Sequence, residues 1–166
     1  MTLQSVSTLR DVQALPQAQS DWRTRIAAVL GNLQQSLQLG AQVAVKPVTF
    51  NAANFTGSSS MTWTVASGGQ SVFWYAQLGK LVEVNFNILG TVGGTVSTSL
   101  QIALPGGLTC ANESVQTVWI FNNSAWSVGA ASVTGSLIVL QTTNAGTGNW
   151  TAGSAGAQGQ IVFQSN

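Results

Sequence analysis

From Val48 onward, apolar and polar residues alternate along the chain with a period of two. In Leu81–Leu89, one face of an extended strand carries only Val, Phe and Ile side chains, while the other carries Glu83, Asn85 and Asn87. Successive side chains of a strand point to opposite faces, so this alternation is typical of a half-buried β-strand. The segment is therefore predicted to lay one face on a core and the other on the surface.

The same signal recurs and predicts further strands over Met61–Ser67, Ser71–Leu78, Ser99–Pro105, Ser114–Asn122, Ser132–Gln141 and Gly159–Gln164. Glycine clusters lie between these runs, at 68–69, 93–94 and 106–107 and in the segment GSAGAQG, where we expect turns. About eight short strands with this spacing predict an all-β fold, an antiparallel β-sandwich or jelly roll.

The first 45 residues follow a helical period instead. In the segment SDWRTRIAAVLGNLQQSLQLG, apolar residues recur at spacings of 4, 3, 4 and 4 and form one stripe: Trp22, Ile26, Val29, Leu33 and Leu37. Ser20 suits the start of this helix as an N-cap, and Gly40 suits its end. We therefore expect an extended arm before Pro16, followed by one α-helix. The stripe needs a partner, which is the β-domain of its own chain, a bundle of identical helices or a host particle.

Charge divides the chain into the same two regions. From Pro47 to Asn166 the ionisable carboxyl and amine side chains are only Lys80, Glu83 and Glu113. We expect residues 1–45 to serve attachment or oligomerisation and residues 46–166 to form the β-sandwich domain.

Two predicted strands are apolar on both faces. These are VFWYA, which contains Trp74, and TVWIF, which contains Trp119 and Phe121. One face of each strand can fill the core, whereas the other needs a cover, which is either the helix or another subunit. Charged residues make up only 5% of the chain, against about a quarter in typical proteins. We favour a second subunit, because so little charge gives little repulsion between copies.

Composition excludes several classes of protein. The mean hydropathy is positive, at +0.25, which argues against a disordered chain. The net charge of +1 and the scattered basic residues argue against nucleic acid as a partner. The longest apolar runs are too short to span a membrane, and the first ten residues lack the pattern of a signal peptide. We expect synthesis in the cytoplasm of a host cell and no membrane insertion.

Candidate catalytic chemistry is sparse. The chain has no histidine, so histidine-dependent nucleophile relays and imidazole metal sites are absent. The single cysteine, Cys110, is interpreted as a packed thiol. Glu83 and Glu113 are the only carboxylates that a glycosidase could use, and we do not favour their pairing. The interpretation is a protein that is not an enzyme and has no cofactor or metal.

A resemblance covers about a third of the chain. In Met61–Thr109, the pattern W-T-V-x-S-G is followed by an aromatic strand, then G-K-x-x-x-V-x-F, and finally I-x-[IL]-P-G-G. This stretch resembles a β-domain of structural proteins in tailed bacteriophages. The matching positions are Trp63, Thr64, Val65, Gly68, Tyr75, Gly79, Lys80, Val84, Phe86, Gly93, Gly94, Thr95, Leu104, Pro105, Gly106 and Gly107.

The resemblance implies a protein of the virion surface, commonly a homotrimeric fibre, spike or capsid decoration held by its amino-terminal segment. Its partners would be further copies of itself and capsid or tail proteins of the phage. The short amino-terminal region departs from long tail fibres, which carry extended shafts. It therefore favours a short spike, a head fibre or a head decoration.

Two tryptophans suggest an alternative function. Trp126 and Trp150 both lie among glycine, serine and asparagine, so they are predicted to lie in exposed loops. An exposed indole beside amide side chains can bind a sugar, which would make the chain a carbohydrate-binding module that recognises a host-surface glycan. The other interpretation is that each tryptophan caps the core or fixes its loop, and we favour it.

Overall fold

The structure, a computed structural model, describes residues 26–32 and 43–166, which belong to two compact units, Met1–Gln42 and Val43–Asn166. In the first unit, residues 26–32 form an α-helix. Two members of the predicted stripe lie in it, and their side chains are about half exposed: Ile26 at 46% and Val29 at 57%. The other three, Trp22, Leu33 and Leu37, lie outside the described residues.

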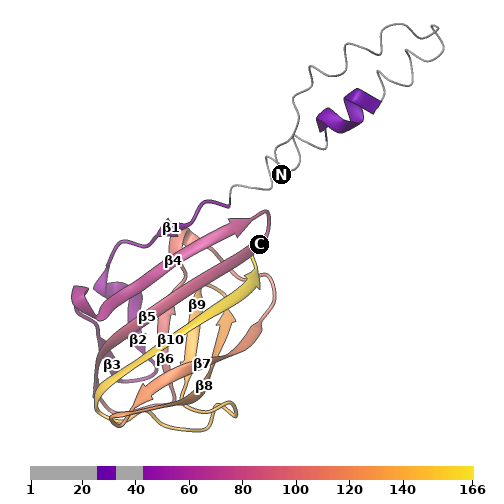
Figure 1. The fold of residues 1–166 in the computed structure, drawn as a ribbon. Coiled ribbons are helices and arrows are strands. Elements are labelled where there is room, and N and C mark those ends of the chain that lie inside the picture. Colours follow the sequence, from indigo (N-terminus) through magenta and orange to yellow (C-terminus); the bar gives the residue numbers. More distant parts are fainter. Residues whose placement is uncertain (1–25, 33–42) are drawn as a thin grey trace, which may run out of the picture. The chain divides into compact units, whose positions relative to one another are not determined.

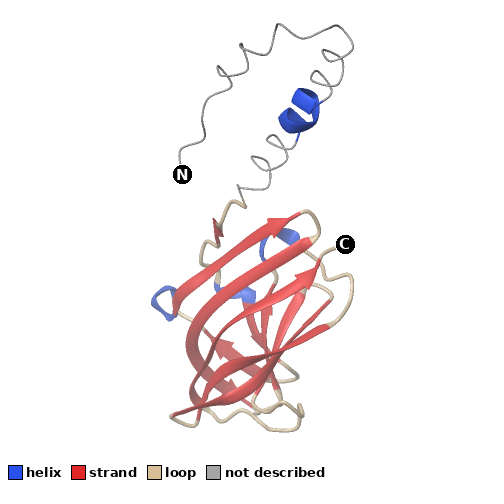
Figure 2. Cartoon of the chain, turned by 45° about the vertical axis from the view of Figure 1, so that its right-hand side comes forward, coloured by secondary structure: helices blue, strands red, loops and turns tan. Residues whose placement is uncertain are grey.

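The second unit is built almost entirely of antiparallel strands (Figures 1 and 2), which confirms the all-β class with one helix. The described residues form ten strands: β1 (Lys46–Pro47), β2 (Phe55–Gly57), β3 (Met61–Thr64), β4 (Gln70–Leu78), β5 (Leu81–Gly94), β6 (Ser99–Ala103), β7 (Ser114–Asn122), β8 (Ala125–Thr134), β9 (Leu137–Gln141) and β10 (Gly153–Gln164). Three short 3-10 turns lie between them: η2 (Ala52–Asn54), η3 (Ser67–Gly69) and η4 (Pro105–Gly107).

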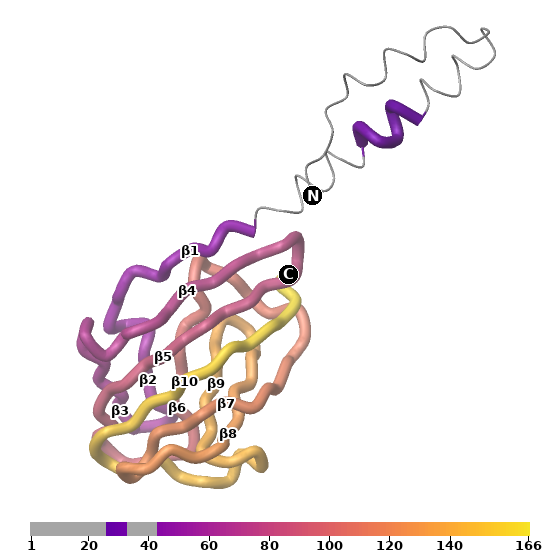
Figure 3. The backbone as a smooth tube through the Cα atoms, viewed as in Figure 1, coloured from indigo at the N-terminus to yellow at the C-terminus, as the bar shows by residue number. Residues whose placement is uncertain are grey.

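The strands form one curled sheet in the order β1-β4-β5-β10-β7-β8-β9-β6-β2, and β3 pairs with the far half of β5. Strands β2 and β3 follow each other along the chain, and the Met61 amide donates to the Ser58 carbonyl at 3.1 Å in the turn that joins them. Because β2 pairs with β6 and β3 with β5, this turn brings the β2 end of the sheet next to β3, which extends the sheet beside β5 (Figure 3). The strands thus enclose a single core. The finer assignment to a sandwich or jelly roll stays a prediction.

The core lies on the inner face of this sheet. On β5 and β10, alternate side chains are completely buried, and they pair across the two strands, as Val84 does with Ile161. Aromatic side chains fill the end nearest β3. There the Phe55 ring packs edge-on against Trp63, with ring centroids 5.5 Å apart, and lies 6.4 Å from Phe73. The alternation in the sequence therefore predicted the buried face of β5 correctly.

Two predictions about the strands were wrong. The segment Ser132–Gln141 is not one strand, because β8 ends at Thr134 and Gly135 turns the chain with a φ of 55° before β9 begins. The segment GSAGAQG is not a turn but the first half of β10, which pairs with β5 along its whole length. Both errors arise because glycine can serve a turn or a crowded position within a strand, and the sequence alone does not separate the two.

Candidate functional site: two apolar surfaces on the outer face

The outer face of β5, β10, β7 and β8 carries a row of apolar side chains. Leu89 lies opposite Gly156, which lies opposite Phe121, which in turn lies opposite Trp126. Residues that are directly opposite on neighbouring strands point to the same face of the sheet. These four positions therefore form one line across four strands, with a glycine in the middle.

The next row of the same strands adds Trp119 opposite Val128. The side chains of Trp119, Val128 and Trp126 are 54%, 49% and 44% exposed, and the rings of Phe121 and Trp126 lie 5.3 Å apart at 49°. We call these five residues, Leu89, Trp119, Phe121, Trp126 and Val128, the aromatic surface. Large apolar side chains of this exposure, gathered on one face, mark an interaction site.

Gly156 leaves room for the apolar side chains on either side of it to approach each other. A Cβ atom at this position would lie 2.2 Å from the Ile88 carbonyl oxygen and 2.8 Å from the Leu89 Cδ2 atom. A real Cβ does not approach backbone this closely, so any larger residue would push β10 away from β5. Glycine here lets the Leu89 side chain fold over the neighbouring strand and join the aromatic surface.

Amide side chains border the aromatic surface. On β5 the outward side chains beyond Leu89 are Asn87 and Asn85, and opposite them on β10 stand Gln158 and Gln160. Gln158 also pairs with Trp119, so an amide lies beside an exposed indole. This amide band carries no charge, and it separates the aromatic surface from a second apolar area.

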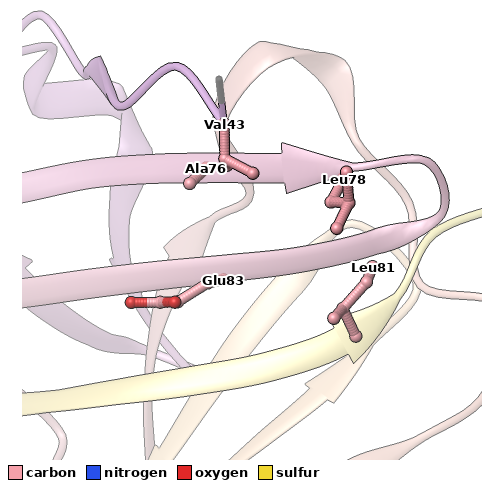
Figure 4. A pocket seen from close by; sticks show the side chains of 5 residues that line it. All are labelled: Val43, Ala76, Leu78, Leu81 and Glu83. Carbon is pink, nitrogen blue, oxygen red and sulfur yellow. The ribbon is translucent and has the colours of Figure 1, made fainter. Parts of the chain in front are cut away.

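The second area lies at the turn between β4 and β5. Leu78 and Leu81 face each other across this turn, and their side chains are 55% and 54% exposed. Together with Val43, Ala76 and Glu83 they line a shallow hollow of about 150 Å³ (Figure 4). We call these five residues, with Lys80 at the turn, the hairpin surface. The hairpin surface lies on the same outer face as the aromatic surface. Its Leu81 is eight residues along β5 from Leu89, a separation of about 27 Å in an extended strand.

Of the three oligomer contacts predicted on the sheet, two lie in the aromatic surface and one lies in neither area. Trp119 and Phe121 belong to the aromatic surface, as the two-sided apolar pattern of their strand indicated. Trp74 points outward from β4, opposite Asn85, and is half-buried. The structure therefore brings Trp119 and Phe121 together and places Trp74 on the far side of the amide band.

Of the two tryptophans predicted to lie in exposed loops, neither does. Trp150 is 1% exposed and belongs to the core, and its backbone amide donates to the Ser97 carbonyl at 2.9 Å. Its indole therefore offers no face to a sugar, and the interpretation that it caps the core is confirmed. Trp126 is exposed, but it lies in β8, a strand that the sequence pattern missed.

Sequence reasoning also missed the leucines of both surfaces. Leu78, Leu81 and Leu89 stand at the ends of predicted strands, where an apolar residue continues the alternation and looks like part of the core. The available signal was their phase: in β5, Leu81 and Leu89 share the parity of Glu83 and not that of the buried Val82. An apolar residue in phase with a strand's polar face is expected on the surface.

The candidate catalytic groups lie in separate elements. Glu83 is half-buried on the outer face of β5, and Glu113 is exposed in the segment before β7. The Cys110 thiol is buried and donates to the Asn112 carbonyl. Within residues 26–32 and 43–166, no group of three or more His, Cys, Asp or Glu side chains could hold a metal ion.

Comparison of the chain with protein-family models, with curated proteins and with solved structures gives no match. Among the helices in the described part, none combines the length and apolar character that crossing a membrane requires. The two apolar surfaces and the nearly uncharged sheet around them are therefore the features on which a functional argument rests.

Proposed function

We propose that this chain is a non-enzymatic structural protein of a phage virion. It would form a homotrimeric knob or short fibre on the particle surface, as a capsid decoration, head fibre or short spike, held by its amino-terminal segment. The observation that carries the proposal is the outer face of the sheet. There the five apolar side chains of the aromatic surface are grouped together, and almost no charged side chains surround them.

Energetics favour covering that face with a protein. Fully burying an exposed Leu or Val side chain contributes roughly 1.5–3 kcal/mol, so one that is already half buried gains about half as much. The outer face holds several such side chains, among them Trp119, Trp126, Val128, Leu78 and Leu81, each more than 40% exposed. Identical copies present identical surfaces, and cyclic symmetry closes the assembly without leaving an open end.

The pattern of Met61–Thr109 supports the assignment to a virion. Its P-G-G motif forms the 3-10 turn η4, in which Gly106 has a φ of 65°. A Cβ atom on Gly106 would lie 2.7 Å from the Tyr75 hydroxyl oxygen. The motif thus reflects how this β-domain is built. Only the resemblance itself links that architecture to tailed phages.

Mass measurement tests the trimer. Light scattering on the purified full chain at micromolar concentration should give three times the chain mass of 17.2 kDa. The variant Trp119→Ser should weaken assembly, whereas Val115→Ser, at an exposed position of the same strand outside the aromatic surface, should leave it unchanged. A stable monomer of the unaltered chain at this concentration would contradict the trimer.

Labelling tests location and attachment. Antibodies against the chain should label purified virions of the phage whose genome encodes it, as seen by electron microscopy. Among the residues that the structure describes, those of the core lie between Val48 and Phe163, so residues 43–166 contain a core of their own. This fragment should stay soluble and fail to bind particles that have been stripped of the protein. Binding equal to that of the full chain would show that the amino-terminal segment is not the attachment site.

A second candidate function is supported by the exposed indoles. Trp119 and Trp126 point to the same face, and the Gln158 amide lies beside Trp119. Indole faces stack on the apolar face of a sugar ring while amides bind its hydroxyl groups, so this surface suits a neutral glycan. A glycan array tests it: binding should be lost with Trp126→Ala and kept with Val115→Ala. Binding by the intact trimer would show that the aromatic surface is open and is not the subunit contact.

A further inference from the structure

Opposite charges gather at the hairpin surface of an otherwise nearly uncharged domain. Of the three charged side chains after Pro47, two stand at the turn between β4 and β5: Lys80 in the turn and Glu83 on β5. Between and beside them lie Leu78 and Leu81, which are more than half exposed. The same few residues thus offer an apolar area, a cation and an anion.

The hollow at this surface is small and mostly apolar. Its volume of about 150 Å³ lies below the range of roughly 300–1,000 Å³ for pockets that take small-molecule ligands. Its walls are the aliphatic side chains of Val43, Ala76, Leu78 and Leu81, with the single carboxylate of Glu83 at one side (Figure 4). An aliphatic stem that ends in a positive charge, as in lysine, complements both parts of this lining.

The backbone of the turn that carries Lys80 is held in place. Lys80 lies at the tip of the turn, and its carbonyl accepts hydrogen bonds from the backbone amide and the hydroxyl of Ser165 at 2.8 and 3.3 Å. Figure 4 shows the Glu83 side chain directed along the strands, away from the tip. The turn is therefore fixed to the end of the domain, while Glu83 lines the hollow on the side away from the tip.

The chain also leaves the domain at this end. Val43, the first residue of the second unit, lines the hollow, so the 42 residues before it depart from beside Leu78 and Leu81. If several copies are held together through their amino-terminal segments, each domain is tethered at Val43, beside its own hairpin surface.

We propose that the hairpin surface binds the hairpin surface of a second copy of this chain, with Lys80 of one copy reaching Glu83 of the next. Leu78 and Leu81 of both copies pack together beneath this ion pair. In the proposed trimer the contact is head-to-tail: Lys80 of each copy meets Glu83 of the next copy, and three such contacts close a ring. The inference rests on the proposed homotrimer and names one of its contacts.

Charge exchange tests the contact. The variants Lys80→Glu and Glu83→Lys each place like charges against each other, whereas the double variant restores an opposite pair with the signs exchanged. By sedimentation of the full chain, we expect each single variant to raise the protein concentration at which half the trimer dissociates by about tenfold, and the double variant to return it to within about threefold. Glu113→Lys, a charge reversal outside this surface, should leave it unchanged.

A second variant tests the apolar part. Leu78→Ser should raise the same concentration at least as much, because it removes packing at every contact. Leu78 is more than half exposed, so the melting temperature of the folded subunit should stay close to that of the parent. Weaker assembly with an unchanged subunit assigns the effect to the contact and not to misfolding.

The outcomes separate this inference from the proposed function. If the unaltered chain forms a trimer and neither single charge variant weakens it, the contact is wrong while the trimer stands. If the unaltered chain is a monomer, the proposed trimer itself fails.

An equimolar mixture of the two single variants should regain only part of the association, since the two variants cannot strictly alternate around a ring of three subunits. Full recovery would overturn the threefold ring in favour of a twofold pair.

Discussion

The two faces of the curled sheet follow opposite rules although the same strands build both. On β7, the inward Val118 and Ile120 are 3% and 0% exposed, while the outward Val115 and Trp119 are 62% and 54% exposed. The inner face is continuous and needs each of its side chains to fill volume. The outer face has two apolar surfaces divided by an amide band. Residue type alone therefore does not tell which face carries the stability of this domain and which is available to a partner.

The sharpest test of this comparison uses two tryptophans. Trp150→Ala removes a side chain that is 1% exposed in the core, so we expect it to lower the free energy of unfolding by about 3–5 kcal/mol. Trp126→Ala removes an outer side chain that is 44% exposed and packs on Phe121, so the loss should be about 1 kcal/mol or less. Urea unfolding of the two variants measures both values. Equal losses would mean that the outer face contributes to stability as the core does.

The second test asks whether Gly156 holds the outer row together. Gly156→Ala places a Cβ atom against the Ile88 carbonyl and should lower the free energy of unfolding by about 2–3 kcal/mol. The control is Gly68→Ala, since a Cβ at Gly68 meets nothing within 4 Å. The control should leave the unfolding free energy within about 0.5 kcal/mol of the parent. Thermal melting of both variants measures these changes in stability. A Gly156→Ala variant as stable as the parent would show that β10 can move away from β5 freely.

A third test changes the same residue type on opposite faces of one strand. Val118→Thr puts a hydroxyl group into the core, where it needs a hydrogen-bond partner, and should cost about 1–2 kcal/mol. Val115→Thr, at a position that is 62% exposed, should change stability by less than about 0.5 kcal/mol. Both variants keep a β-branched side chain, so strand propensity is matched. Chemical denaturation of the pair gives the difference, and the order would be reversed if the assignment of the two faces were wrong.

The smallest effect is expected from pH. The chain has no histidine, the residue whose ordinary pKa lies between pH 5 and 8, and charged side chains are few on both faces. Few protons are then exchanged on unfolding in that range, so stability should stay nearly constant. Melting temperatures between pH 5 and 9 should agree within about 4 °C, which is about 1 kcal/mol for a domain of this size. A change above about 8 °C would reveal a buried ionisable group and reopen an enzymatic interpretation.

The pattern of the sequence by itself determined the all-β class and most of the buried face. In β5, the alternation of Val82, Val84 and Phe86 with polar residues requires those side chains to point one way, because a strand repeats every two residues. On β7 the pattern predicted a second apolar face that needs a cover, and the structure places Trp119 and Phe121 on the outer side. These features depend only on neighbours along the chain, and for that reason they could be predicted.

Other features were decided only by the tertiary structure. Trp126 and Trp150 have similar neighbours in the sequence, yet one lies on the outer face and the other in the core. The difference arises from which strands the curled sheet brings together. Likewise, the exposed Leu78, Leu81 and Val43 form one surface because β4, β5 and the segment before β1 meet at one end of the domain. Burial depends on atoms that are distant along the chain, and so no local pattern contains it.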